Sequence, residues 1–173
     1  MRRDVVRRVS KGSRRSLSPA KAGGANKTGL TFICYGELAG QQPYEAWCTA
    51  HAGVHAVALE TIAEDLGVPS HRVAGWLGLS RRAVARKVRM RRSFDVSDSE
   101  RVLALARIIG QLVSASPSVD PRASILMLRW LGSWLERPLP ALGGLPPCVL
   151  MDTAEGRQLV SLTLAQMVDG SYA

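Results

Sequence analysis

The chain has little of what membrane spans and disulfide frameworks are made from. None of its apolar runs approaches the roughly 18 residues that a membrane helix requires. Its three cysteines, Cys34, Cys48 and Cys148, are odd in number, widely spaced and form no CxxC pair. This pattern indicates no disulfide framework and fits a reducing compartment. We therefore expect a cytoplasmic protein that does not enter a membrane.

The residue patterns of catalytic centres are also missing. Cys148 has no histidine after it in the chain, whereas a cysteine nucleophile needs a partnered histidine and an orienting group. Asp152 and Glu155 are better explained as helix-start residues than as an acid–base pair. The Gly-Gly pair at 143–144 is not followed by the Lys and Ser or Thr of a phosphate loop. We predict that the protein is not an enzyme and uses no cofactor.

One group of residues has spacing that a metal site could use. Cys48, His51 and His55 could share one helical face, with Cys34 as a distant fourth ligand. Structural zinc requires four ligands in tetrahedral geometry, and Gly53 interrupts the segment. We favour a helix with surface or core histidines and predict no metal site.

Positive charge is concentrated in two blocks. Residues 1–30 hold nine Lys and Arg against one acid, and residues 71–92 hold eight against none. Residues 31–70 carry five acids and no Lys or Arg, and residues 93–173 hold six bases and eight acids. Within a net charge of +9, this distribution favours a polyanion-binding front half and a different role for the rear. Aromatic residues, at 5%, are too few for the stacking platform that single-stranded RNA recognition favours.

Residues 1–29 are rich in Arg, Ser, Gly and Lys and poor in apolar residues, so we predict a disordered basic tail. It is either a solvated tail or an arm that adds phosphate contacts. Leu30–Tyr35, which follows it, predicts a short strand or an extended packing segment.

The rest of the chain predicts helices, and therefore an all-α fold. Apolar residues at helical spacing indicate helices over Pro43–His51 and Val57–Leu66, and Gly67 is placed to end the second. Ser97–Glu100 has the S-x-x-E pattern of a capping box, which predicts the start of a longer helix.

A further helix is predicted from Asp120 and Pro121, as N-cap and first residue, to about Leu135. It is apolar over much of its circumference, which is typical of a central core helix or a dimer interface. Trp130 and Trp134 lie one turn apart on it; core packing is the favoured interpretation and an exposed binding hot spot the alternative.

Residues 70–90 have the pattern of a helix-turn-helix. Ser70 is placed to cap a first helix, Gly78-Leu79 makes a tight turn, and Ser80 is placed to cap a second helix over Arg81 to about Met90. A helical wheel puts Val84 towards the core and the arginines on the opposite side. The alternative is a solvated basic helix face. The predicted DNA-binding residues are Ser80, Arg81, Arg82, Arg86, Lys87 and Arg89.

Residues 138–173 predict a Pro- and Gly-rich turn followed by a last helix. A short helical turn begins at Pro146 or Pro147, and Asp152 and Thr153 sit where the N-cap of the last helix belongs. Val160, Leu164 and Met167 recur at helical spacing in it, and Gly170 is placed to end it.

This rear pattern resembles the C-terminal toxin-binding domain of Xre-type antitoxins, the Xre/MbcA/ParS group. The family pattern is roughly WL…P-x-x-ALGG-x-x-P…LLDT-x-x-G…V…L…GxYA, with Met151 here where Leu is usual and Pro140 where a polar residue is frequent. Gly78 to Lys87 resembles the segment that ends the family's recognition helix, with Ala83 in place of the usual Thr. The matching residues are Trp134-Leu135, Pro138, Ala141-Leu142-Gly143-Gly144, Pro147, Leu150-Met151-Asp152-Thr153, Gly156, Val160, Leu164, Gly170 and Tyr172-Ala173.

The resemblance implies an antitoxin of a type II toxin–antitoxin pair. In that family the partner is usually a RES-domain toxin that consumes NAD, although some relatives face a toxin with ADP-ribosyltransferase-like chemistry. The rear domain binds the toxin, and its extreme C-terminus shuts substrate out of the toxin's active site. The front domain binds the operon's own promoter, normally as a dimer on repeated half-sites. The implied toxin-binding residues are Leu142, Gly143, Gly144, Leu150, Asp152, Thr153, Gly170, Ser171, Tyr172 and Ala173.

We therefore expect a helix-turn-helix DNA-binding domain over residues 30–95 and a small helical dimerisation and toxin-binding domain over 96–173. The expected partners are a cognate RES-type toxin, operator DNA and a second copy of the chain. The alternative is a stand-alone helix-turn-helix regulator whose rear domain senses a ligand or only dimerises.

Overall fold

The computed structural model describes residues 32–115 and 120–170, and in these residues the fold is built from helices alone. The predicted basic tail, Pro117 and the last three residues lie outside the described residues. The all-α prediction is confirmed for the part that the structure describes. The helices are α1 (Phe32–Ala39), α2 (Pro43–Ala52), α3 (Val57–Leu66), α4 (Ser70–Trp76), α5 (Arg81–Arg89), α6 (Val96–Ala115), α7 (Pro121–Leu135) and α8 (Ala154–Val168), with short 3-10 helices η1 (Pro140–Leu142) and η2 (Pro147–Leu150).

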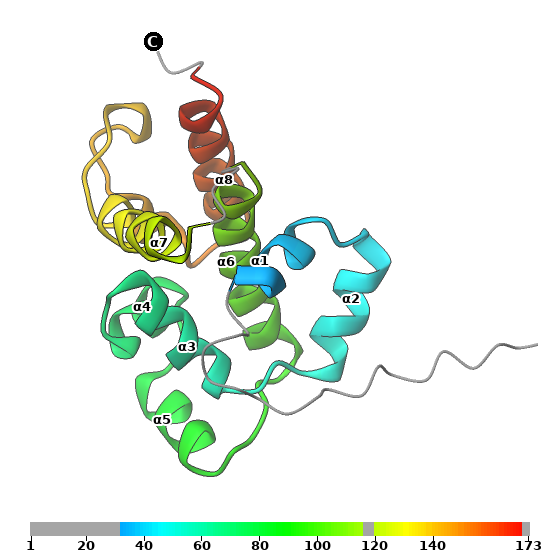
Figure 1. Ribbon diagram of the computed structural model, residues 1–173. Coiled ribbons are helices and arrows are strands. Elements are labelled where there is room, and N and C mark those ends of the chain that lie inside the picture. Colours follow the sequence, from blue (N-terminus) through cyan, green and yellow to red (C-terminus); the bar gives the residue numbers. More distant parts are fainter. Residues whose placement is uncertain (1–31, 116–119, 171–173) are drawn as a thin grey trace, which may run out of the picture.

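Helix α6 runs through the middle of the molecule (Figure 1). It packs against α1 and α2 on one side and against α7 and α8 on the other, while α3 joins α7 to α4. Figure 1 shows α3, α4 and α5 gathered near one end of α6 and α8 at the other. The buried apolar side chains of both halves form a single cluster, which extends from Leu59 through Ile109 to Leu164.

Several helix boundaries follow their predicted signals. Helix α3 ends at Leu66, and Gly67 adopts a left-handed φ of 68° as its C-cap. Asp120 caps α7 by accepting a hydrogen bond from the Arg122 backbone N–H. Ser80 caps α5 by accepting one from the Ala83 N–H.

Three local predictions were wrong. The described part of the predicted Leu30–Tyr35 strand is helical, because α1 begins at Phe32 and continues to Ala39. Ser70 is the first residue of α4 rather than its cap, a position that Pro69 takes with extended backbone. The capping box at 97–100 is displaced, because the Asp95 carboxylate accepts from the Asp98 N–H and α6 already begins at Val96.

The two tryptophans of α7 have different surroundings. Trp134 is buried with Leu131 and Leu135, as the core interpretation predicted, and its indole N–H donates to the sulfur of Met167 on α8. Trp130 stacks on Trp134 and remains 40% exposed. The outer face of α7 also exposes Ile125 and Leu126, so this helix contributes to the core and leaves an apolar face outside it.

No helix within the described residues combines the length and apolar character needed to cross a bilayer.

Close backbone contacts at glycines bring the helices together. A Cβ on Gly110 of α6 would overlap the carbonyl of Tyr35 in α1, and a Cβ on Gly132 of α7 would overlap the carbonyl of Leu66 in α3. Any side chain at either position would therefore separate two helix backbones whose contact shapes the core.

We expect Gly132→Ala to destabilise the fold by about 1–3 kcal/mol, because the added methyl meets backbone rather than a movable side chain. Urea unfolding of the full chain measures the change. Gly36→Ala is the matched control: Gly36 is also helical, and its added Cβ meets only the Ser114 hydroxyl at 3.7 Å. We expect the control to be neutral or to stabilise by about 0.5–1 kcal/mol through helix propensity. Equal effects of both changes would contradict the role given to Gly132.

Candidate functional site

The basic helix α5 presents its arginines outward. Val84 is buried on its inner side, while Arg82, Arg86 and Arg89 are exposed. Gly78 makes the turn between α4 and α5 with a φ of 64°, a left-handed conformation that glycine adopts without steric cost. The arrangement has the form of a helix-turn-helix whose second helix exposes its charged side to solvent.

Lys87 differs from the arginines of α5. Its ammonium lies 3.4 Å from an Asp95 carboxylate oxygen and 3.9 Å from one of Asp98, and it stands over the ring of Phe94. The Asp98 backbone N–H and then Lys87 lower the pKa of the Asp95 carboxyl. The charge of Lys87 is therefore largely balanced within the chain, whereas the sequence placed it among the DNA contacts.

The turn before α5 is held by a residue that the sequence did not single out. The guanidinium of Arg101, on α6, donates to the carbonyl oxygens of Leu77 and Gly78 at 3.1 and 3.2 Å. On the same side of the turn, a Cβ on Gly78 would lie 3.5 Å from the Cβ of Asp152. The sequence around Arg101 does not predict this contact, because the partners of the guanidinium are backbone carbonyls of the turn between α4 and α5.

The Pro- and Gly-rich turn after α7 closes on itself. The Leu139 N–H donates to the Leu145 carbonyl, and the Gly144 N–H donates back to the Leu139 carbonyl. Gly143 and Gly144 have φ values of 65° and 79°, so both positions favour glycine for conformational reasons. Leu142, one of the predicted toxin-binding residues, is only 6% exposed in this conformation, and its contact with a toxin stays a prediction.

The start of α8 is fixed by a cap and by a close approach. The Thr153 hydroxyl accepts a hydrogen bond from the Gly156 N–H, which confirms Thr153 as the N-cap. A Cβ on Gly156 would overlap the carbonyl of Leu150. Buried Arg157 donates to the Met151 carbonyl, and its burial lowers the pKa of its guanidinium. Asp152 remains exposed at the surface beside the helix-turn-helix.

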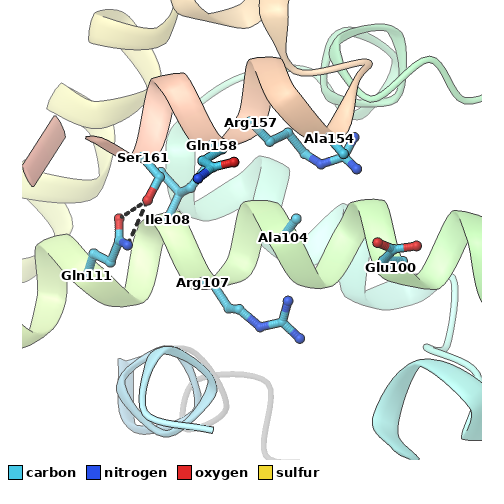
Figure 2. A pocket seen from close by; sticks show the side chains of 9 residues that line it. All are labelled: Glu100, Ala104, Arg107, Ile108, Gln111, Ala154, Arg157, Gln158 and Ser161. Carbon is cyan, nitrogen blue, oxygen red and sulfur yellow. Dashed lines mark hydrogen bonds between the residues drawn. The ribbon is translucent and has the colours of Figure 1, made fainter. Parts of the chain in front are cut away.

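A polar groove lies between α6 and α8 (Figure 2). Gln111 and Ser161 bridge its walls through hydrogen bonds of 2.8 and 3.0 Å. Figure 2 shows Glu100 and Arg107 on α6 and Arg157 on α8 along the same groove. The groove therefore carries charged side chains of both signs together with neutral polar ones.

The rear half exposes apolar side chains that the sequence patterns did not separate from the core. Leu159 and Leu162, one turn apart on α8, are 46% and 55% exposed. Val149 in η2 and Leu145 before it are also exposed. Apolar residues occur on several sides of α8, so periodicity alone did not show which of them face solvent.

The histidines of the possible metal site and the predicted toxin contacts at the C-terminus are the last two groups of residues. His51 stacks on Trp47, and His55 contacts the Arg91 carbonyl; in the described residues no cluster of three His, Cys, Asp or Glu side chains has metal-site geometry. Gly170 follows α8 with a φ of 69°, while the predicted toxin contacts Ser171, Tyr172 and Ala173 lie outside the described residues.

Comparison with known proteins assigns a family to these two halves. Residues 49–107 match the model of the antitoxin Xre-like helix-turn-helix domain, and residues 128–170 match that of the antitoxin Xre/MbcA/ParS C-terminal toxin-binding domain. The chain is also 35% identical, over 149 residues, to the Prs ADP-ribosylating antitoxin of Sphingobium sp. (strain YBL2), a match that covers 86% of this chain and 94% of that protein.

The chain therefore belongs to the Xre/MbcA/ParS family of antitoxins. It is an antitoxin of a toxin–antitoxin system and not an enzyme, and the alternative of a stand-alone regulator is set aside. The first matched segment contains the whole helix-turn-helix, and the second contains the glycine turn, η2 and α8.

Proposed function

We propose that this antitoxin neutralises a RES-type toxin that uses NAD, by laying its C-terminal segment over the toxin's active site, and that it represses its own promoter through α5. It acts in the cytoplasm, where both NAD and the operon are found. The two binding functions are separated at the start of α6. Residues 30–95 bind operator DNA, and residues 96–173 bind the toxin and a second copy of the chain.

The name of the Sphingobium relative bears on the toxin's chemistry. That relative is described as a Prs ADP-ribosylating antitoxin. Consumption of NAD by hydrolysis and transfer of ADP-ribose both begin with NAD bound in a cleft and with loss of nicotinamide. An antitoxin that fills the cleft blocks either reaction, and the relative's name favours ADP-ribose transfer for the present toxin.

The exposed apolar surface of the rear half is the observation that carries the toxin-binding proposal. Leu159, Leu162 and Val149 are solvent-exposed in the segment that matches the toxin-binding domain. Exposed leucines in neighbouring turns of a helix supply the apolar centre that a stable protein interface needs. The outer face of α7, with Leu126 and Trp130, remains for the second copy of the chain.

We expect Leu159→Asp combined with Leu162→Asp to weaken toxin binding at least tenfold, about 1.4 kcal/mol, because two charges would enter an apolar contact. Calorimetric titration of purified toxin measures this change. Both positions are exposed, so the fold should be preserved. Tyr44→Asp is the control, since Tyr44 is 75% exposed on α2 and lies outside both matched segments. Unchanged toxin affinity in the double variant would place the interface elsewhere.

Deletion of Ser171–Ala173 is expected to abolish rescue of growth when toxin and antitoxin are co-expressed, and to leave operator binding intact. The physical reason is that the deleted residues supply the part that enters the toxin's cleft. Full rescue by the shortened chain contradicts active-site blocking, even where the two proteins still co-purify.

Arg82→Ala combined with Arg86→Ala is expected to weaken operator binding at least tenfold, because an arginine on this face contributes either a base-edge contact of about 1–3 kcal/mol or a charge-assisted hydrogen bond to a phosphate. A gel shift with the operon's promoter measures the loss, and a pull-down should show unchanged toxin binding. Arg122→Ala combined with Arg137→Ala removes the same charge from exposed positions of α7 and its C-terminal flank, and should leave DNA affinity almost unchanged. Equal losses in the two double variants would mean that net charge, rather than the face of α5, sets the affinity.

A further inference from the structure

The end of α5 and the segment after it form a basic hollow. Only Arg86 and Lys87 of its lining are among the predicted DNA-binding residues. Its lining consists of Arg86, Lys87, Met90, Arg92 and Ser93. Arg86 belongs to the outward face of α5, so the hollow is continuous with that face. Arg91, the neighbour of Arg92, does not line it.

The backbone here forms a Schellman motif with an arginine at the position that usually holds glycine. The Arg92 N–H donates to the Lys87 carbonyl at 2.8 Å, and the Arg91 N–H donates to the Val88 carbonyl at 3.0 Å. Arg91 has a φ of 50°, in the left-handed region that is sterically unfavourable for a residue with a Cβ. The last carbonyls of α5 are thereby capped, and the chain turns sharply enough to bring Arg92 back beside Arg86.

Contacts from the α2–α3 connection hold this turn in place. The Ala56 N–H donates to the Arg92 carbonyl at 3.0 Å, and the Phe94 N–H donates to the Val54 carbonyl at 2.8 Å. The Nε2 of His55 lies 2.9 Å from the Arg91 carbonyl while its Nδ1 accepts from the Val57 N–H. Both His55 bonds are satisfied by one neutral tautomer, with the proton on Nε2. The α2–α3 connection therefore supports the turn at three successive points, the carbonyls of Arg91 and Arg92 and the N–H of Phe94.

The cations of the hollow are not equivalent. Lys87 is paired with Asp95 and Asp98. Arg86 and Arg92 have no ion pair within the described residues, and the Ser93 hydroxyl adds a hydrogen-bond donor beside them. Two unbalanced guanidinium groups and a hydroxyl suit a phosphate group, which accepts hydrogen bonds on several oxygens.

We infer that this hollow binds a backbone phosphate of the operator, with Arg92 and Arg86 as its ligands and the left-handed Arg91 turn as its support. In a helix-turn-helix the N-terminal residues of the second helix reach base edges. The hollow lies at the opposite, C-terminal end of α5, where it would meet the sugar–phosphate chain that borders the groove. It fixes how the helix is seated and reads no sequence. This inference rests on the proposed operator binding.

The test compares two adjacent arginines of which only one lines the hollow. Binding of the full chain to its promoter fragment, and to an unrelated duplex of the same length, is measured by fluorescence anisotropy at several KCl concentrations. The slope of log K against log salt is negative, and we expect Arg92→Ala to reduce its magnitude by about 0.9, the value for one lost phosphate contact. Affinity for both duplexes should fall by a similar factor, and Arg92→Lys should recover part of it.

Arg91→Gly is the matched control. It also removes one positive charge, but it preserves the left-handed turn, so the salt slope should stay near that of the unchanged chain. Equal slope changes in Arg91→Gly and Arg92→Ala overturn the inference in favour of diffuse charge. A loss with Arg92→Ala that is confined to the promoter fragment overturns it in favour of base reading. If the unchanged chain binds neither duplex, the proposed operator binding fails and the inference fails with it.

Discussion

Helix α6 is buried along most of its circumference, and the arrangement of the other helices depends on this. Its apolar residues face several directions, with Leu105 and Ile109 fully buried and Leu103 and Ile108 nearly so. A helix that is apolar on several sides must be covered by other elements on those sides, and α1, α2, α7 and α8 pack against α6 in this way. Gly110 permits the closest of these contacts, because the carbonyl of Tyr35 occupies the space that a Cβ would need.

This central position joins the two functional halves physically. Arg101 reaches from α6 to the turn before α5, and Asp152, just before α8, approaches the same turn. A third link is the ion pair of 3.0 Å between Arg72 on α4 and Glu136 at the end of α7. The helix-turn-helix is therefore supported by side chains of the rear half, and neither half has a separate core.

Much of the fold could be predicted from the sequence, because its signals are local. Gly67 ends α3, Asp120 begins α7 and Thr153 begins α8, each through bonds to residues within one turn. The displaced cap of α6 has a cause outside its own helical turn. Ser97 fits a cap as well as Asp95 does, and the choice between them depends on how α6 meets the preceding chain, where the Ser99 hydroxyl accepts from the distant Val54 N–H.

The site was less predictable than the fold for the same reason. Exposure of Arg82 and Arg86 follows from helical periodicity, so the basic face of α5 could be predicted. The pairing of Lys87 with Asp95 and Asp98, and the reach of Arg101 to the turn, depend on tertiary packing. No spacing rule distinguishes a lysine that contacts DNA from one whose partners lie at the start of the next helix.

The family pattern in the rear half is mainly a description of backbone shape. Gly143 and Gly144 have positive φ, Thr153 is a cap, and Gly156 permits contact with the Leu150 carbonyl. Each of these residues has a structural reason that requires no toxin. Residues that set the path of the backbone cannot by themselves distinguish one toxin from another. The toxin interface proposed above therefore assigns specificity to the exposed side chains that this path presents, such as Leu159 and Leu162, which lie at positions that the pattern does not specify.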